Sequence, residues 1–436
     1  MLLQEVKERG HLTDTELADF VAEAFRGEDV DGKRVLCIIP DHTRSMPMAA
    51  MFRALCDTLR RRVAQLDYLV ALGTHPPLSD DALNRLVGIT GEERAGKFAD
   101  IGIFNHEWRN PDALTHVGTL TENDVAEISG GLMRRKADVL VNKRVLDYDL
   151  LCIVGPVFPH EVVGFSGGNK YFFPGLAGAE ILNLFHWLGA LITNPVINGT
   201  KNTPVREVVD RAARLIKREK RCFCLNVMGK QCKAVFYGGP EEAWSAAADL
   251  SATTHIVYKD RPYQSVLAMA PAMYDEIWVA GKCMYKLEPI VADGGELIIY
   301  APHISEVSVT HGELIRRIGY HTRDYFLAQM DKFRDIPGGI LAHSTHVRGI
   351  GTYEHGVEKA RIRVTLATKI PEDQCRAINL GYRDPASIDP GDWKDREDEG
   401  LLLVPQAGEV LYRLKEGGPK PRPFKEVAGP GRDQSQ

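Results

Sequence analysis

The chain has 436 residues, of which 44% are hydrophobic and 26% charged, so it can bury large cores and is expected to form two domains. Its formal net charge is -5 without a concentrated basic block, which gives no electrostatic reason to bind nucleic acid or an anionic membrane and leaves small molecules as the expected partners. The start has no export signal, no run of about 20 apolar residues is present, and the eight cysteines are scattered, so we predict a cytoplasmic protein with reduced thiols.

The first two thirds of the chain alternate apolar, strand-like runs with helix-like segments. Capping boxes, in which a threonine is followed three residues later by a glutamate, mark helix starts at Thr13 and Thr90. We expect strands at 34–40, 68–75, 99–106 and 149–160, and helices at 51–63, 80–88 and 179–191. This order predicts a parallel α/β sheet. Polar residues cluster just past the strand ends, which is the edge where ligands bind in open α/β sheets.

The pattern restarts near residue 263. Further strands are expected at 276–282, 296–303, 339–343 and 361–367, with a helix at 311–319. The fold class predicted is therefore α/β, with two α/β domains and a ligand cleft between them. We place an N-terminal domain at 1–263, a C-terminal domain that closes the cleft at 264–416, and a flexible tail, rich in Gly, Pro and charge, at 417–436.

Two short motifs follow expected strands of the first domain. In PDHTR (40–44), Asp41 can orient a histidine or a hydroxyl, and Arg44 can bind a carboxylate or a phosphate. The alternative is that the same motif is a turn with Asp41 as a helix cap and Arg44 in solvent. In GTHPP (73–77), His75 is a candidate base, although a single histidine at a strand end is more often structural. His106 has the same ambiguity and is kept as a spare.

The segment VVGFSGGNKYFFPGLAG (162–178) places Lys170 behind a glycine-rich turn. It departs from the phosphate-binding loop, because Asn169 replaces the second glycine and Tyr171 replaces the hydroxyl that binds magnesium. With His160 before it and His186 after it, the turn suits covalent attachment through an amine beside an imidazole that binds a metal. The alternative is a phosphate bound by the backbone amides of residues 164–168.

The second domain offers two weaker signals. Lys282, at the end of an expected strand, would face the cleft and bind a carboxylate, whereas most lysines are simply solvated. His343 and His346 lie three residues apart, which would suit a metal on a helix, but their segment is predicted to be a strand.

Taken together, PDHTR, GTHPP, His160 with GFSGGNK, the histidine at 186, Lys282 and the ADGGELII segment resemble the lactate racemase family over about residues 34–303. Members of that family are isomerases that carry a nickel-pincer nucleotide (nickel pyridinium-3,5-bisthiocarboxylic acid mononucleotide). The resemblance implies that this cofactor is attached to Lys170, with the turn residues Gly164, Ser166, Gly167 and Gly168 around it, and that His186 binds the nickel. It also implies catalytic roles for His75, His160, Asp41 and Arg44, and substrate-binding roles for Arg44, Lys282 and Trp278.

On this basis we expect a racemase or epimerase of a 2-hydroxy acid, which moves a hydride to the cofactor and back, and which depends on the proteins that synthesise the cofactor. The chain departs from the family where Trp278 and Val279 replace a tyrosine and a glutamine, where Pro76 replaces a residue that is often basic, and where a late tryptophan has no secure match. The substrate is therefore left open between lactate, malate, an aromatic hydroxy acid and a sugar acid such as gluconate, and the oligomeric state is also open.

Two other classes of function stay open. One is a zinc-dependent hydrolase or lyase that uses His75, His106 and His160. The other is a non-catalytic protein that binds a phosphate or a nucleotide at the glycine-rich turn. Both would make the joint spacing of the motifs a coincidence.

Overall fold

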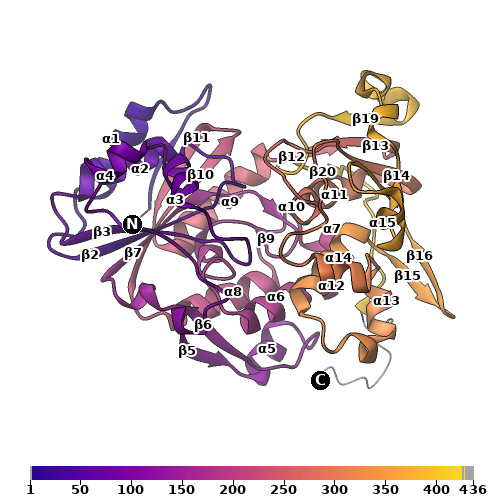
Figure 1. Cartoon of the computed structure of the whole chain (residues 1–436), viewed down its shortest axis with the longest axis horizontal. Coiled ribbons are helices and arrows are strands. Elements are labelled where there is room, and N and C mark those ends of the chain that lie inside the picture. Colours follow the sequence, from indigo (N-terminus) through magenta and orange to yellow (C-terminus); the bar gives the residue numbers. More distant parts are fainter. Residues whose placement is uncertain (1, 425–426, 428–436) are drawn as a thin grey trace.

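The computed structural model describes residues 2–424 and 427. Figure 1 shows two α/β units side by side, with the first half of the chain on the left and the later residues on the right. The left-hand unit is built on a seven-stranded sheet in the order β1-β11-β10-β7-β2-β3-β4, of which β10, β7, β2, β3 and β4 are parallel. These strands are β1 (Leu3–Val6), β2 (Arg34–Ile39), β3 (Gln65–Val70), β4 (Ile103–Asn105), β7 (Leu150–Pro156), β10 (Glu219–Met228) and β11 (Gln231–Gly238).

Helices cover both faces of this sheet, because its central strands are apolar on both sides. In β2, Cys37 faces a core that includes α1 (Asp14–Ala24), α2 (Met48–Leu59) and α3 (Asp80–Val87). Ile38 faces the opposite core, which includes α5 (Glu122–Ile128), α6 (Ala179–Ile192), α8 (Pro204–Leu215) and α9 (Pro240–Thr254). Shorter elements are α4 (Gly91–Ala95), α7 (Asn194–Ile197), the antiparallel strand pair β5–β6 (Leu114–Leu120, Ala137–Asn142) and the hairpin β8–β9 (Pro159–His160, Gly164–Phe165).

The right-hand unit has a five-stranded parallel sheet in the order β18-β17-β14-β13-β19. Its strands are β13 (Tyr263–Met269), β14 (Val291–Ala301), β17 (Arg363–Thr368), β18 (Gly381–Tyr382) and β19 (Leu401–Val404). Its helices are α10 (Ile277–Ala280), α11 (Lys282–Leu287), α12 (Gly312–Ile318), α13 (Arg323–Ala328), α14 (Gly338–Arg348) and α15 (Glu372–Ala377). Two strand pairs complete it: β12–β20 (Ile256–Lys259, Leu411–Leu414) and β15–β16 (Gly351–Glu354, Val357–Ala360).

The predicted α/β class and both capping boxes are confirmed. Two predicted strands are wrong: residues 276–282 form α10 and the start of α11, and residues 339–343 lie in α14. In α14 every residue from 339 to 347 is buried, and the helix packs on α6 of the other unit. A helix without a polar face shows no 3.6-residue period, so a short apolar run cannot be told from a buried strand.

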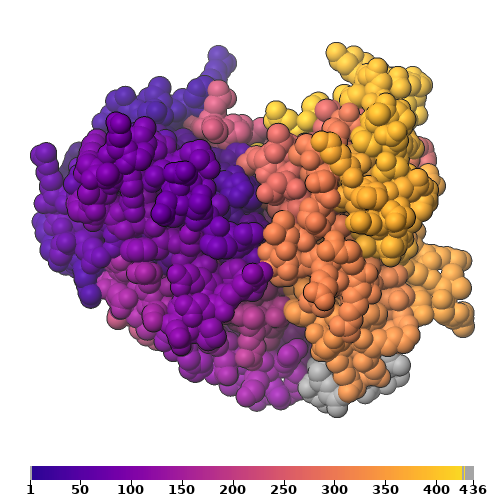
Figure 2. Space-filling view, viewed as in Figure 1, coloured from indigo at the N-terminus to yellow at the C-terminus, as the bar shows by residue number. Residues whose placement is uncertain are grey.

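The two units meet along a long seam (Figure 2). Strand β20, late in the chain, pairs with β12, which precedes the strands of the right-hand sheet. The predicted domain boundaries stay predictions. The described part of the predicted tail reaches Phe424. Within it, the Arg422 carbonyl accepts a hydrogen bond from Arg323 at 2.7 Å. Residues 425–426 and 428–436 of that tail lie outside the described residues. Within residues 2–424, no helix combines the length and the apolar character needed to cross a membrane.

Candidate functional site

A cavity of about 420 Å³ lies between the two units, at the carboxyl edge of the seven-stranded sheet. Strands β2, β3 and β7 all end at this edge because they run parallel, so the turns that follow them meet there. The right-hand unit contributes α10, α11 and α14. Most of the side chains singled out in the sequence line this cavity: Asp41, Arg44, His75, His160, Ser166, Gly167, Lys170, His186, Trp278 and Lys282.

Asp41 and His75, from the ends of two neighbouring strands, form a pair in which Asp41 is buried and His75 is partly exposed. His75 Nδ1 lies 2.5 Å from Asp41 Oδ2, and the other carboxylate oxygen accepts hydrogen bonds from the backbone and the hydroxyl of Thr43. Burial alone would raise the pKa of Asp41, but the contact with His75 and the charge of Arg44 hold it well below its usual range. An ionised carboxylate only accepts hydrogen bonds, so Nδ1 of His75 carries the proton and neutral His75 has its lone pair on Nε2.

Two cations in the cavity have no carboxylate partner. The Arg44 guanidinium is 3.5 Å and 3.4 Å from the carbonyl and hydroxyl oxygens of Thr43, which are long contacts. Lys282 Nζ is buried, has no hydrogen-bond partner among the described residues, and lies 4.7 Å from the ring centroid of Tyr274. Burial, together with the charge of Arg44, holds the pKa of Lys282 well below its usual range. A bound carboxylate would satisfy both groups.

Lys170 and His186 open into the same cavity from the glycine-rich turn and from α6. Burial and the charge of Arg44 lower the pKa of Lys170 to about 7, so a large share of this amine is neutral and nucleophilic near neutral pH. His186 Nδ1 is 2.8 Å from the carbonyl oxygen of Leu182, and burial lowers the pKa of His186 to about 4. Nδ1 therefore donates to that carbonyl, which leaves Nε2 with a lone pair that can bind a metal.

His160 ends β8 on the other side of the turn. Its Nδ1 accepts a hydrogen bond from the backbone of Val162 at 3.1 Å and lies 3.4 Å from Glu161 Oε2. Burial and the positive charge of Lys170 hold the pKa of His160 well below its usual range, so the ring is neutral.

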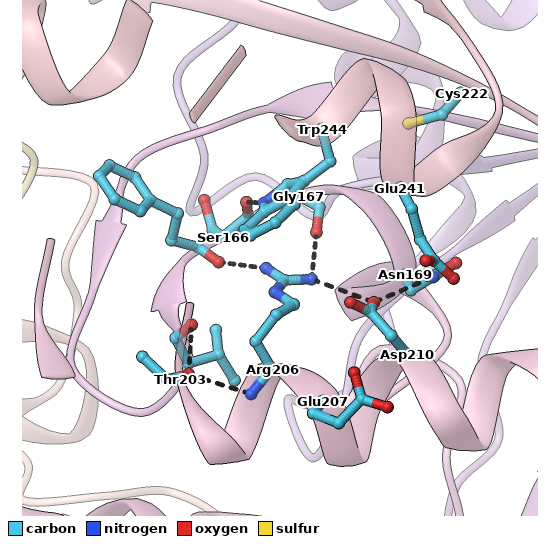
Figure 3. Close-up of polar contacts among 12 residues, drawn as sticks. Ser166, Gly167, Asn169, Thr203, Arg206, Glu207, Asp210, Cys222, Glu241 and Trp244 are labelled. Carbon is cyan, nitrogen blue, oxygen red and sulfur yellow. Dashed lines mark hydrogen bonds and ion pairs between the residues drawn. The ribbon is translucent and has the colours of Figure 1, made fainter. Parts of the chain in front are cut away.

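A clamp that we did not predict holds the turn carrying Lys170 (Figure 3). The buried Arg206 of α8 donates to the carbonyl oxygens of Phe165 and Gly167, and its guanidinium carbon lies 3.9 Å from the ring centroid of Trp244. Trp244 Nε1 donates to the carbonyl of Ser166 at 2.9 Å. Three consecutive carbonyl groups are thus fixed by side chains, and the turn is rigid where it presents Lys170.

An acidic side chain completes this clamp. Asp210 lies 3.9 Å from Arg206, one helical turn away on α8, and accepts a hydrogen bond from Asn169 Nδ2 at 3.0 Å. Asn169, the residue that breaks the phosphate-binding pattern, therefore ties the turn to α8.

Two of the predicted turn glycines, Gly164 and Gly168, pack against other residues of the protein and do not line the cavity. Gly164 has φ +86°, and a Cβ there would lie 1.8 Å from the carbonyl oxygen of Thr200. Gly168 has φ +58°, and a Cβ there would meet Trp244 at 2.9 Å. Neither lines the cavity, whereas Ser166 and Gly167 do. Close packing of the backbone explains the need for glycine at 164 and 168.

Two other candidate histidines, His106 and His343, use both ring nitrogens in hydrogen bonds within the protein. Both ring nitrogens of His106 are hydrogen-bonded, one to the carbonyl of Ala177 and one to Asn142. His343 is held between two tyrosine hydroxyl groups, those of Tyr285 at 2.8 Å and Tyr320 at 3.2 Å. Neither ring has a free nitrogen for a metal.

Trp278 forms an aromatic wall of the cavity. Its ring centroid lies 4.1 Å from that of His343 and 4.5 Å from that of His311, so the indole is packed between two imidazoles. His311 also contacts the Thr74 hydroxyl of the other unit at 3.1 Å, beside His75. Sequence reasoning missed this wall because it joins residues more than thirty positions apart in the chain.

The three histidines proposed as zinc ligands, His75, His106 and His160, do not all line one cavity. His106 does not line the cavity, and among residues 2–424 no group of three His, Cys, Asp or Glu side chains is arranged to hold a metal ion. A protein-only zinc site needs at least three such ligands.

The sequence of this chain is similar to those of lactate racemases. The family profile described as lactate racemase N-terminal domain matches residues 21–196. The lactate racemase of Thermoanaerobacterium thermosaccharolyticum is 27% identical over 62% of this chain and 60% of its own length. That of Lactiplantibacillus plantarum is 27% identical over 53% of this chain and 50% of its own length. The aligned part of this chain thus spans about half to three fifths of these curated relatives.

Two solved structures resemble the whole chain. A protein from Thermotoga maritima is 34% identical, with 94% of this chain and 100% of that chain covered and a TM-score of 0.85. The lactate racemase apoprotein from Thermoanaerobacterium thermosaccharolyticum has a TM-score of 0.70 over 93% of this chain and 94% of its own, at 19% identity, which supports the fold. With the motifs in order along the chain, these matches lead to one conclusion: residues 21–196 of the chain belong to the lactate racemase N-terminal domain family.

Proposed function

We propose that the protein is an isomerase, a racemase or epimerase that interconverts the two configurations at the hydroxyl-bearing carbon of a small 2-hydroxy acid. The observation that supports it best is a single cavity holding an amine of lowered pKa (Lys170), two imidazoles (His75 and His160) and two cations without carboxylate partners (Arg44 and Lys282). A phosphate-binding protein would need the cations but neither the imidazoles nor the activated amine.

The residues fit the nickel-pincer nucleotide. Lys170 offers a nucleophilic amine for its attachment, and His186 offers an Nε2 lone pair as one metal ligand. The cavity of about 420 Å³ is within the usual range for cofactor sites of about 300–1,000 Å³. When bound, this group would supply the acceptor for the hydride of the substrate's α-carbon, which avoids forming a dianion by deprotonation.

The protein's own residues would bind the substrate and move its hydroxyl proton. Arg44 and Lys282 would hold the carboxylate, which fixes the α-carbon and lets the 2-oxo group turn about that anchor. His75, oriented by Asp41, would take the hydroxyl proton of one enantiomer at Nε2. His160 would do so for the other enantiomer, because the two enantiomers present their hydroxyl groups on opposite sides.

The substrate could be lactate or a larger 2-hydroxy acid: malate, an aromatic hydroxy acid, or a sugar acid such as gluconate. Trp278 supports acids larger than lactate, because it offers a flat surface for the group beyond the reacting carbon.

The test is the mass of the intact protein after co-expression with the proteins that make the cofactor. We expect an adduct that maps to the Lys170 peptide and disappears, with racemisation, in Lys170→Ala. Lys286→Met is the matched control, because it removes another buried lysine of the same cavity, whose Nζ is held by the carbonyl of Pro159. The control should keep the adduct. An alanine variant that retained full activity would exclude the proposed function.

A further inference from the structure

The two imidazoles proposed as bases have different neighbours on the ring nitrogen that faces away from the reaction. His75 Nδ1 meets a carboxylate oxygen of Asp41 at 2.5 Å, so its proton is fixed on Nδ1 and Nε2 is the basic atom. His160 Nδ1 accepts a backbone N–H from Val162 at 3.1 Å. In a neutral ring this bond requires the proton to be on Nε2. The two rings therefore rest in opposite tautomers.

The resting tautomer of His160 is the wrong one for a base. With a proton already on Nε2, the ring can donate a hydrogen bond to a substrate oxygen but cannot take up the hydroxyl proton at that atom. To act as a base at Nε2, His160 must first carry its proton on Nδ1. That form needs an acceptor beside Nδ1, where the Val162 amide cannot serve because it is itself a donor.

Glu161 supplies such an acceptor. Its Oε2 lies 3.4 Å from His160 Nδ1, slightly beyond a good hydrogen bond, so a small movement toward the ring would complete the bond. Residues 160–164 form the tight β8–β9 hairpin, in which His160 pairs with Gly164. The Glu161 carboxylate and the Val162 amide thus lie on the same short turn, and both compete for His160 Nδ1.

We propose that Glu161 is a positioning residue that switches His160 between two tautomers, and that this switch makes His160 competent as the second base. The inference rests on the proposed function, since it concerns the same reaction. The change moves one proton between sites of the neutral ring: Nε2 loses a proton to solvent and Nδ1 gains one, with no change in net charge. The Nδ1–H then donates to Glu161 in place of the bond from Val162.

Under this proposal, the reaction of one enantiomer depends on Glu161 and that of the other does not. The enantiomer whose hydroxyl faces His75 meets a base that Asp41 already holds in the active tautomer. The enantiomer whose hydroxyl faces His160 meets one that must switch first. Loss of Glu161 should therefore slow the first half-reaction of one enantiomer only.

The experiment uses Glu161→Gln, which keeps the side-chain volume and removes the charge. The control is Glu409→Gln, which removes a carboxylate from the same cavity on the side of the right-hand unit. The first measurement is ¹⁵N NMR of histidine-labelled protein, with the His160 resonances assigned by their loss in His160→Asn. We expect Glu161→Gln, whose neutral amide oxygen is a weaker acceptor than a carboxylate, to lower the population of His160 protonated at Nδ1 relative to the parent and to Glu409→Gln.

The second measurement is stopped-flow absorbance of the cofactor-loaded protein with each enantiomer separately. We expect Glu161→Gln to slow the half-reaction of one enantiomer by about 10- to 100-fold, at or below the lower end of what loss of a general base causes, and the other by less than about two-fold. If His160 has the same tautomer in the parent, Glu161→Gln and Glu409→Gln, the proposal is wrong. If the tautomer shifts in Glu161→Gln but both enantiomers slow equally, Glu161 does control His160 and the two-base function is what fails.

Discussion

The clamp on the turn that carries Lys170 leads to a quantitative prediction. Replacing Arg206 by methionine keeps an unbranched, buried side chain but removes the charge and all hydrogen-bond donors. Two carbonyl groups, those of Phe165 and Gly167, lose their donor, and buried Asp210 loses its cation. Removing one partner of a buried ion pair typically costs about 3–5 kcal/mol, because the other charge stays buried and unpaired.

We therefore expect Arg206→Met to lower the free energy of unfolding by about 3–5 kcal/mol. The matched control is Arg214→Met on the same helix, whose side chain is 50% exposed and pairs with Glu241 at 2.8 Å. An exposed pair of that kind is worth about 0–1 kcal/mol. Asp210→Asn combined with Arg206→Met should recover part of the loss, because the uncompensated charge is gone. Denaturant unfolding measures all four proteins.

The same variant should also affect attachment of the cofactor. With the turn no longer fixed, Lys170 samples more positions, and the fraction of protein carrying the adduct should fall at a fixed time of co-expression. Arg206→Lys separates charge from geometry, because a lysine cannot bridge two carbonyls with a planar fork. If Arg206→Met cost no more stability than Arg214→Met and left the adduct unchanged, the clamp would not be what positions Lys170.

Two further predictions concern the buried cations. In protein without cofactor, the rate of acylation of Lys170, followed by peptide mass spectrometry, should titrate with a midpoint near pH 7, because burial and the charge of Arg44 disfavour the charged amine. Arg44→Leu should move this midpoint upward. A midpoint near pH 10 in the parent would contradict the lowered pKa. A pKa depressed by folding also means that this lysine's contribution to stability rises with pH between about 7 and 10.4. Lys282→Met should leave the melting temperature unchanged or raised, since Nζ has no hydrogen-bond partner among the described residues, yet raise the KM for the 2-hydroxy acid by about 10-fold or more. An unchanged KM would remove Lys282 from the carboxylate site.

Sequence patterns predicted the strand-end side of the cavity because parallel strands bring distant turns to one edge. Asp41 and His75 are 34 residues apart, yet both follow parallel neighbours, so their contact follows from topology. The patterns failed where burial removes periodicity: α10, α11 and α14 are buried on nearly all sides, so apolar runs in them resembled strands. Lys282 was placed at the cleft but on the wrong kind of element.

Arg206 was missed for a different reason. On α8 it borders the stripe formed by Val205, Val208 and Val209, a position where arginine is normally a solvated flank of an amphipathic helix. Its burial comes from tertiary packing, in which Trp244 of α9 lies over the guanidinium and the turn at Phe165 and Gly167 lies against it. A signal did exist in the spacing of Arg206 and Asp210, which lie four residues apart and can pair on one helix face, but surface pairs share that spacing.

The charges of the cavity explain why the reaction would need both an amine attachment and a carboxylate substrate. Arg44, Lys170 and Lys282 bring positive charge together in a buried space, and each of the two lysines has a pKa lowered first by burial and then by Arg44. Acylation of Lys170 removes one of these charges for good, and a bound carboxylate neutralises another. Each event would relieve part of the repulsion among these buried positive groups. The arrangement that makes the empty cavity electrostatically unfavourable is thus the same one that selects an anionic substrate.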